Sequence, residues 1–126
     1  MPGPEDKAIA EALKRDRTVD ISTRGRRSGQ WRRIEIWFHN LDGRIYLTSI
    51  PGPRDWRANI LEHGELIFHL KESVQADLPA RGRSVSDPAV REAVLGNPLM
   101  DWYHRRSGSR QTFVSEAVLV EVILDH

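Results

Sequence analysis

The chain has 126 residues and a formal net charge of only +1, with 39% hydrophobic and 29% charged residues. This length and composition predict one globular domain, 1–126, with one core, and they exclude a disordered chain. No apolar stretch approaches the roughly 20 residues of a membrane span and no signal peptide is evident, so we expect a cytoplasmic protein. The chain contains no cysteine, which excludes disulfides, thiolate metal ligands and a cysteine nucleophile.

The charge is distributed unevenly. Residues 24–33 contain five arginines and no acid, whereas the rest of the chain has 14 basic and 18 acidic residues, a net charge of −4. A protein that follows a nucleic-acid backbone needs a wider positive surface than this. The local cluster therefore favours one compact anion as the ligand and argues against nucleic acid as a partner.

The first half of the chain predicts an N-terminal helix and three strands. The segment 1–16 contains an amphipathic helix from about residue 5 to 15, and residues 18–23 are extended. Glycines then mark a turn at 25–29, and alternation predicts a strand at 31–39 whose two faces both carry large apolar groups, so we expect both to be covered. Asp42 and Gly43 indicate a hairpin, followed by a return strand at 44–50.

The second half predicts alternating helices and strands. Asp55 is the expected cap of a helix that ends at His63, before strands at 66–70 and 74–80; Pro79 places the latter at an edge or a bulge. Helices are expected at 87–96 and 97–106, and a long strand at 113–124. About six mostly antiparallel strands with inserted short helices define an α+β fold, with an open sheet or a small barrel.

The turn at 25–29, with sequence GRRSG, is the first candidate site. Its glycines allow several backbone N–H groups to point at one anion. Arg26, Arg27 and Arg32 can bind phosphate oxygens through their forked guanidinium groups, and the Ser28 hydroxyl can donate a further hydrogen bond. A solvated basic hairpin explains the same residues equally well, because the sequence is neither a Walker loop nor a GxGxxG motif.

Two helical segments carry the other candidates. Trp56, Asn59 and Ile60 share one stripe of their helix, and a buried Asn59 amide requires either protein partners or a polar ligand. Tyr103 or His104 is a candidate proton donor. The five histidines lack metal-ligand spacing, so no metal site is predicted, and no serine lies in a Gly-x-Ser-x-Gly elbow.

The segment 23–32, with sequence TRGRRSGQWR, resembles the T-x-G-R-[KR]-[ST]-G-x-x-R signature of the deazaflavin-dependent nitroreductase and quinone reductase family. Residues 56–60, WRANI, match its downstream W-x-x-N-[LI] element, and the resemblance spans about 19–85. It implies a split β-barrel, related to pyridoxamine-phosphate-oxidase-like FMN-binding proteins, that binds coenzyme F420. The implied coenzyme-binding residues are Arg26, Arg27, Ser28, Arg32, Ile34, Ser49, Trp56 and Asn59.

This sequence departs from the family pattern in two places. The loop 50–55 lacks the longer Gly-Gly-containing segment with its lysine, for which Arg54 is the candidate replacement. The substrate-lining tyrosines have only approximate counterparts, Trp37 and Tyr103, and Tyr103 is the candidate proton donor.

Three functions are compatible with these features. The first is a reductase that transfers a hydride from reduced F420 to a small acceptor such as a quinone, a nitro compound or an activated alkene. The second is a module that carries FMN or a deazaflavin without turnover, and the third is a small nucleic-acid-binding barrel. The resemblance leaves a monomer and a homodimer equally open.

Overall fold

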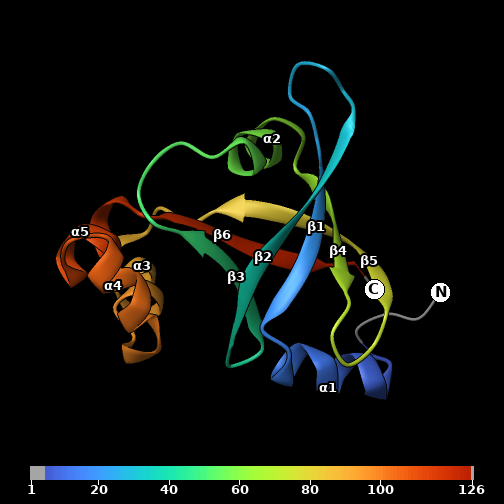
Figure 1. Ribbon diagram of the computed structural model, residues 1–126, viewed down its shortest axis with the longest axis horizontal. Coiled ribbons are helices and arrows are strands. Elements are labelled where there is room, and N and C mark those ends of the chain that lie inside the picture. Colours follow the sequence, from blue (N-terminus) through green and yellow to red (C-terminus); the bar gives the residue numbers. More distant parts are fainter. Residues whose placement is uncertain (1–4, 126) are drawn as a thin grey trace.

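The computed structural model describes residues 5–125. Within them, six strands close into an antiparallel barrel in the order β1-β2-β3-β6-β5-β4 (Figure 1). The strands are β1 (Thr18–Arg24), β2 (Trp31–Leu41), β3 (Arg44–Ser49), β4 (Glu65–Leu70), β5 (Ala76–Ser84) and β6 (Val118–Leu124). The expected antiparallel barrel with inserted short helices is therefore confirmed.

The helices cover the two ends and one side of the barrel (Figure 1). They are α1 (Lys7–Arg15), α2 (Asp55–His63), α3 (Pro88–Leu95), α4 (Asp101–Arg106) and α5 (Arg110–Glu116), with a short 3-10 helix at Pro98–Met100. α1 lies at one end, α2 at the other, and α3 to α5 gather beside β3 and β6. Asp6 caps α1 by accepting the N–H groups of Ala8 and Ile9, and Gly64 ends α2 with φ 79°.

The buried apolar residues form two clusters, where the sequence predicted one core. One fills the barrel and includes Ile21, Leu47 and Phe68, which are fully buried. The other lies between the outer wall of the barrel and the three C-terminal helices; it includes Tyr46 and Phe113. α3 to α5 thus form a second layer over one wall, and this layer contributes residues to the site described below.

The predicted strand at 113–124 is wrong in its first half. Residues 110–116 form α5, because the Ser109 hydroxyl caps this helix by accepting the N–H of Thr112 at 3.0 Å. The Phe113 ring stacks on Tyr103 with centroids 5.2 Å apart. The apolar spacing of this segment was ambiguous, and packing against α4 selects the helix.

Two element boundaries, one helix cap and the position of Pro79 also differ from the predictions. The expected strand at 74–80 runs from Ala76 to Ser84, and the expected helix at 97–106 is a 3-10 turn followed by α4. The cap of α2 is Arg54, and Asp55 occupies its first turn. Pro79 lies at no sheet edge; its carbonyl accepts the N–H of Asp125, just beyond the end of the β5–β6 pairing at Ala80↔Leu124.

β2 is covered less than predicted. It pairs with β1 from Trp31 to Trp37, but with β3 only between Phe38 and Leu41. The two strands diverge beyond that point, and β2 projects away from the barrel wall (Figure 1). Ile34 is consequently 39% exposed and Trp37 is 44% exposed. This divergence is the split in the barrel, and it opens a cleft.

Candidate functional site

The segment 25–29, here called the arginine turn, connects β1 to β2. The Gly25 N–H donates to the Gln30 carbonyl at 2.8 Å, and the Gly29 N–H donates to the Gly25 carbonyl at 2.9 Å. Gly29 has φ 73°, and a Cβ at Gly25 would lie 2.5 Å from the Ser28 Oγ. Gly29 therefore suits the turn because of its positive φ, whereas a side chain at Gly25 would displace the Ser28 hydroxyl and crowd the Gln30 carbonyl oxygen at 3.2 Å.

Asn59 attaches the arginine turn to α2. Its Oδ1 accepts the backbone N–H of Arg26 at 3.0 Å, and its Nδ2 donates to the Thr23 Oγ1 at 3.1 Å. The side chain is buried, and the His63 ring approaches the Gly25 carbonyl at 3.3 Å. The amide thus has protein partners on both sides, which is one of the two arrangements expected from the sequence. Its direct contact with a coenzyme stays a prediction.

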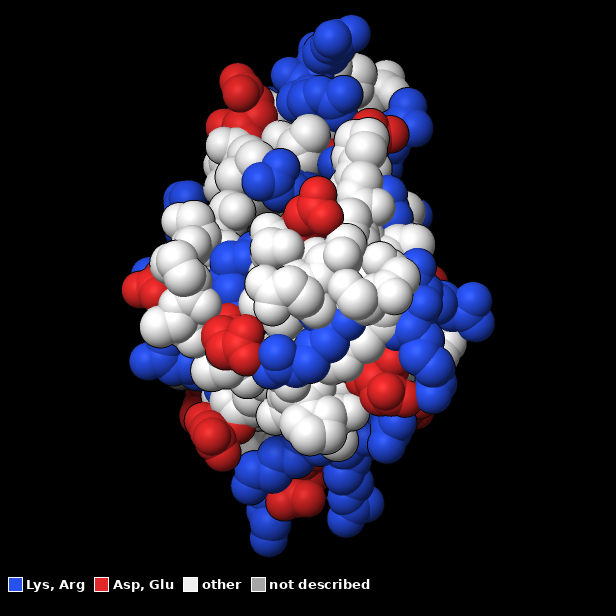
Figure 2. Space-filling model, turned by 90° about the vertical axis from the view of Figure 1, so that its left-hand side faces the viewer, with Lys and Arg blue, Asp and Glu red and all other residues white. Residues whose placement is uncertain are grey.

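A cavity of about 220 Å³, here called the turn cavity, lies beside the arginine turn. It is lined by Gly25, Arg26, Arg27, Ser28, Arg32, Asp55 and Asn59. Arg26 pairs with Asp55 at 3.4 Å, whereas within residues 5–125 neither Arg27 nor Arg32 has an acidic partner within 4 Å. Lys and Arg side chains gather at this end of the molecule (Figure 2). Two guanidinium groups are therefore available to an anion.

A second cavity, here called the split cleft, occupies the wedge where β2 and β3 diverge. It has a volume of about 300 Å³ and is lined by Glu35, Ile36, Trp37, Thr48, Ser49, Ile50, Trp102 and Tyr103. The Trp37 and Trp102 rings lie 5.2 Å apart, and the Arg106 guanidinium lies 4.3 Å from the Trp102 ring centroid. Aromatic walls of this kind suit a flat ring system.

The backbone edge of β2 faces the split cleft. The Phe38 N–H donates to the Arg17 carbonyl, and the Gln30 carbonyl accepts from Gly25, so the even-numbered residues of β2 turn their peptide groups towards β1. Alternation turns the peptide groups of Arg33, Glu35 and Trp37 the opposite way, where β3 has already diverged. This edge offers N–H donors and carbonyl acceptors to a ligand in the cleft.

The turn cavity and the split cleft are connected along β2. Arg32 lines the first and Glu35 the second, and three residues of strand span about 10 Å. Ile34 lies between them and is partly exposed, but it lines neither cavity. Trp56 is 7% exposed and packs into the barrel core, so it anchors α2 to the barrel.

The structure thus divides the predicted site residues into three groups. Arg26, Arg27, Ser28, Arg32 and Asn59 line the turn cavity, Ser49 and Tyr103 line the split cleft, and Ile34 and Trp56 line neither. The guanidinium group of Arg54 donates to the carbonyls of Pro53 at 2.8 Å and Ile50 at 3.3 Å. Arg54 therefore braces its own short loop.

Tyr103 has a partner that the sequence did not indicate. Its hydroxyl lies 3.1 Å from the Nε2 of His39, which β2 carries two residues after Trp37. Burial raises the pKa of Tyr103 to about 12. Burial, followed by the charge of Arg17, lowers the pKa of His39 to about 4. Both groups are therefore neutral near pH 7, and the phenol keeps its proton.

We expect the pH dependence of stability to reflect His39. The unfolded chain protonates this imidazole below about pH 6.5. The folded state resists protonation until about pH 4, so the contribution of His39 is complete above pH 6.5 and is lost as the pH falls towards 4. Unfolding measured in urea should therefore depend more steeply on pH in this range for the unmodified protein than for His39→Gln. An NMR titration midpoint of His39 near 6.5 would contradict the assignment.

The outer wall of the barrel carries a series of hydrogen bonds that no local sequence pattern indicated. The Ser22 hydroxyl lies 2.7 Å from the Nε2 of His69, whose Nδ1 lies 2.6 Å from the Asp77 carboxylate. The order resembles a nucleophile, base and carboxylate, but Ser22 and His69 are buried and line neither the turn cavity nor the split cleft. These contacts connect β1, β4 and β5, and we interpret them as structural.

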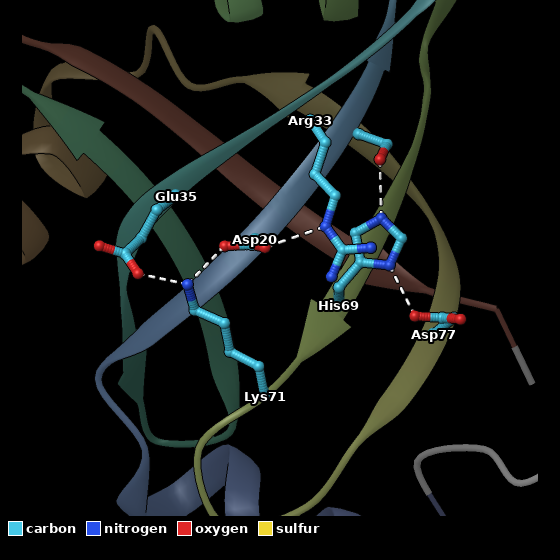
Figure 3. Close-up of polar contacts among 7 residues, drawn as sticks. Asp20, Arg33, Glu35, His69, Lys71 and Asp77 are labelled. Atoms are coloured by element: carbon cyan, nitrogen blue, oxygen red, sulfur yellow. Dashed lines mark hydrogen bonds and ion pairs between the residues drawn. The ribbon is translucent and has the colours of Figure 1, made fainter.

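A network of ion pairs lies beside these hydrogen bonds on the same wall of the barrel (Figure 3). Asp20 accepts from Arg33 at 2.9 Å and from Lys71 at 2.6 Å, and Lys71 also contacts Glu35. The hydrogen bond from Lys71 is the main cause that lowers the pKa of Asp20. The network fixes β2 to β1 and β4 on the face opposite to Arg32 and Ile34, and so holds the strand that connects the two cavities.

Within residues 5–125, no group of three or more histidine, aspartate or glutamate side chains is arranged to hold a metal ion. No helix in that range is long and apolar enough to cross a membrane. The features of the candidate site that can bind a ligand are its arginines, its aromatic wall and the free backbone edge of β2.

No protein-family model matches the chain, and no curated protein matches it in sequence. Solved structures do match. A protein of the pyridoxinephosphate oxidase family from Clostridium acetobutylicum has a TM-score of 0.67 at 12% identity, covering 91% of this chain and 80% of that one. An FAD-binding protein from Mesorhizobium loti has a TM-score of 0.64 at 15% identity, covering 93% and 87%. An F420 reductase has a TM-score of 0.60 at 17% identity, covering 92% of each chain.

These similarities establish the fold. The chain has the split-barrel fold of the pyridoxamine-phosphate-oxidase-like structures that it matches, as the motif resemblance implied. At 12–17% identity they carry no activity to this chain. Function has to be argued from the turn cavity and the split cleft.

Proposed function

We propose that this protein is an oxidoreductase that binds coenzyme F420 and transfers a hydride from its reduced form to a small acceptor, such as a quinone, a nitro compound or an activated alkene. One observation carries the proposal. Within residues 5–125, Arg27 and Arg32 have guanidinium groups without acidic partners; Arg32 lies about 10 Å along β2 from a cleft with aromatic walls, and Arg27 lies in the turn that precedes this strand. An elongated coenzyme with an anionic tail and a flat ring fits this arrangement.

The residues of this chain divide the work of binding. Arg27, Arg32 and the Ser28 hydroxyl hold the phosphate and acidic tail, while Asn59 fixes the turn that carries them. The adjacent Trp37 and Trp102 side chains form one wall beside the ring and limit access of water. The free peptide groups of Glu35 and its neighbours on β2 meet the polar edge of the ring.

When bound, the reduced deazaflavin supplies the hydride. Tyr103 supplies a proton to the reduced acceptor, because its phenol lines the cleft and keeps its proton near pH 7. The Nε2 of His39, 3.1 Å from this hydroxyl, orients it. The residue assignments extend the motif resemblance, in which Tyr103 is only an approximate counterpart of the family tyrosines.

Binding of FMN is the second candidate, and the FAD-binding protein from Mesorhizobium loti supports it. The arginine turn accepts a flavin phosphate as readily as a deazaflavin phosphate, since both present the same oxyanion. A carrier without turnover would retain the turn cavity but would not need the Tyr103–His39 pair. Nucleic acid is less well supported, because Asp55 lies in the turn cavity and Arg33, on the outer face of β2, is already paired with Asp20.

A fluorescence titration with F420, run beside an identical titration with FMN, tests the proposal. We expect quenching with a micromolar or lower Kd for F420 and weaker binding of FMN. Addition of menadione to the protein with reduced F420 should then restore the fluorescence of the oxidised coenzyme. Tight binding without this recovery favours the carrier. If neither coenzyme binds with a micromolar or lower Kd, both the reductase and the carrier hypotheses are wrong.

A further inference from the structure

A third cavity lies across α2 from the arginine turn. It has a volume of about 470 Å³ and is lined by Arg57, Ser84, Val85, Ser86, Pro88, Arg91, Val114, Ser115, Glu116 and Ala117. Arg57 lies two residues from Asp55 and two from Asn59, which line the turn cavity, so it projects from the opposite side of α2. This cavity, here called the Arg57 cavity, is therefore separate from the proposed coenzyme site.

Arg91 is held rigidly in the wall of the Arg57 cavity. Its Nε donates to the Val114 carbonyl at 3.1 Å, and its two terminal nitrogens donate to the carbonyls of Val85 at 3.1 Å and Ala117 at 2.6 Å. Three of the five N–H groups of the guanidinium are used in this way, and two remain. The group is thus fixed in place before any ligand arrives.

The second arginine has no such partners. Within residues 5–125, Arg57 forms neither a side-chain hydrogen bond nor an ion pair, and Arg91 has no carboxylate within 4 Å. Burial, and then the charge of Arg57, lowers the pKa of Arg91. Two cations therefore face one cavity with no carboxylate of residues 5–125 within 4 Å of either, an arrangement that an anion would stabilise.

We propose that the Arg57 cavity binds a small organic oxyanion, a carboxylate or a phosphate ester carried on an apolar body. The two guanidinium groups bind the oxyanion, and the hydroxyls of Ser84 and Ser86 offer further donors. Val85, Val114 and Ala117 provide an apolar wall for the body of the ligand. The volume lies within the roughly 300–1,000 Å³ of small-molecule sites.

Glu116, at the rim of the Arg57 cavity, provides a control variant whose effect on anion affinity should be opposite to that of removing Arg57. Its carboxylate is exposed and lies farther than 4 Å from both arginines, so the cavity retains a net positive charge. Removing this negative charge should strengthen anion binding, whereas removing Arg57 should weaken it. A merely structural role for these residues would not give opposite effects on affinity.

Titration of the ¹⁵N-labelled protein with phenyl phosphate, and separately with benzoate, tests the proposal residue by residue. We expect amide shifts at 84–86 and 115–117 that saturate with one Kd. In Arg57→Gln this Kd should rise about tenfold, the loss of one charge-assisted hydrogen bond. In Glu116→Gln it should fall about twofold. The two probes show whether phosphate or carboxylate is preferred.

Arg15→Gln, which removes an exposed arginine from α1, is the matched control and should leave the Kd unchanged. Shifts confined to 25–32 would overturn the proposal, as would an unchanged Kd in Arg57→Gln. The result is independent of the F420 titration, because the amides of the Arg57 cavity and of the arginine turn are read separately. Loss of coenzyme binding would therefore not count for or against this site.

Discussion

Replacing Arg27 and Arg32 together by alanine should lower the affinity for F420 by about 100-fold or more. Each guanidinium lines the turn cavity and has no acidic partner in the part of the chain that the structure describes, and a charge-assisted hydrogen bond contributes about 1.5–3 kcal/mol. Both side chains are exposed, so the free energy of unfolding should change by less than about 0.5 kcal/mol. Fluorescence titration and urea unfolding measure the two quantities on the same preparation.

The control for this pair is Arg44→Ala, at the β2–β3 hairpin on the far side of the barrel from the arginine turn. It removes one positive charge from an exposed strand residue, against two in the double variant, and should leave the Kd unchanged. Salt should weaken binding in the unmodified protein much more than in the double variant, because screening acts on the charges that have been removed. If the double variant binds as tightly as the unmodified protein, the tail does not lie in the turn cavity.

The elements that the sequence predicted well are those with local signals. The glycines of the arginine turn, the Asp42-Gly43 hairpin and the helix predicted from residue 87 each depend on signals within a few residues, and all lie where expected. The same holds for the stripe of α2, on which Trp56, Asn59 and Ile60 are buried. The arginine turn was found because its residues are contiguous.

The parts that were missed depend on contacts between distant segments. Alternation along β2 indicated a covered strand, but no local pattern shows that residues 31–37 of β2 have no partner on β3, whose pairing with β2 begins only at Phe38. The partners of Tyr103 and Ser22 lie 64 and 47 residues away in sequence. The α5 helix was the exception, because Ser109, three residues before Thr112, is a capping signal that could have revealed it.

Phe113→Ala should destabilise the fold by about 3–5 kcal/mol, the largest loss of stability that we predict for a single substitution. The ring is fully buried in the cluster under α3 to α5 and stacks on Tyr103 at 5.2 Å. Phe113→Leu should cost much less, because it leaves a smaller void. Urea unfolding measures both, and Val90→Ala, at a partly exposed position on α3, serves as the control with a change below about 1 kcal/mol.

The same variants separate the two ends of the proposed coenzyme site. Phe113 supports Tyr103, which lines the split cleft, whereas the arginine turn lies beyond it along β2. Phe113→Leu should therefore weaken binding of F420 through the ring and leave its salt dependence intact, while the double arginine variant should lose the salt dependence. Ser109→Ala, which removes the cap of α5 and should cost about 1 kcal/mol, tests the same support without touching the cleft. Equal salt dependence in all variants would mean that the two cavities do not bind one ligand.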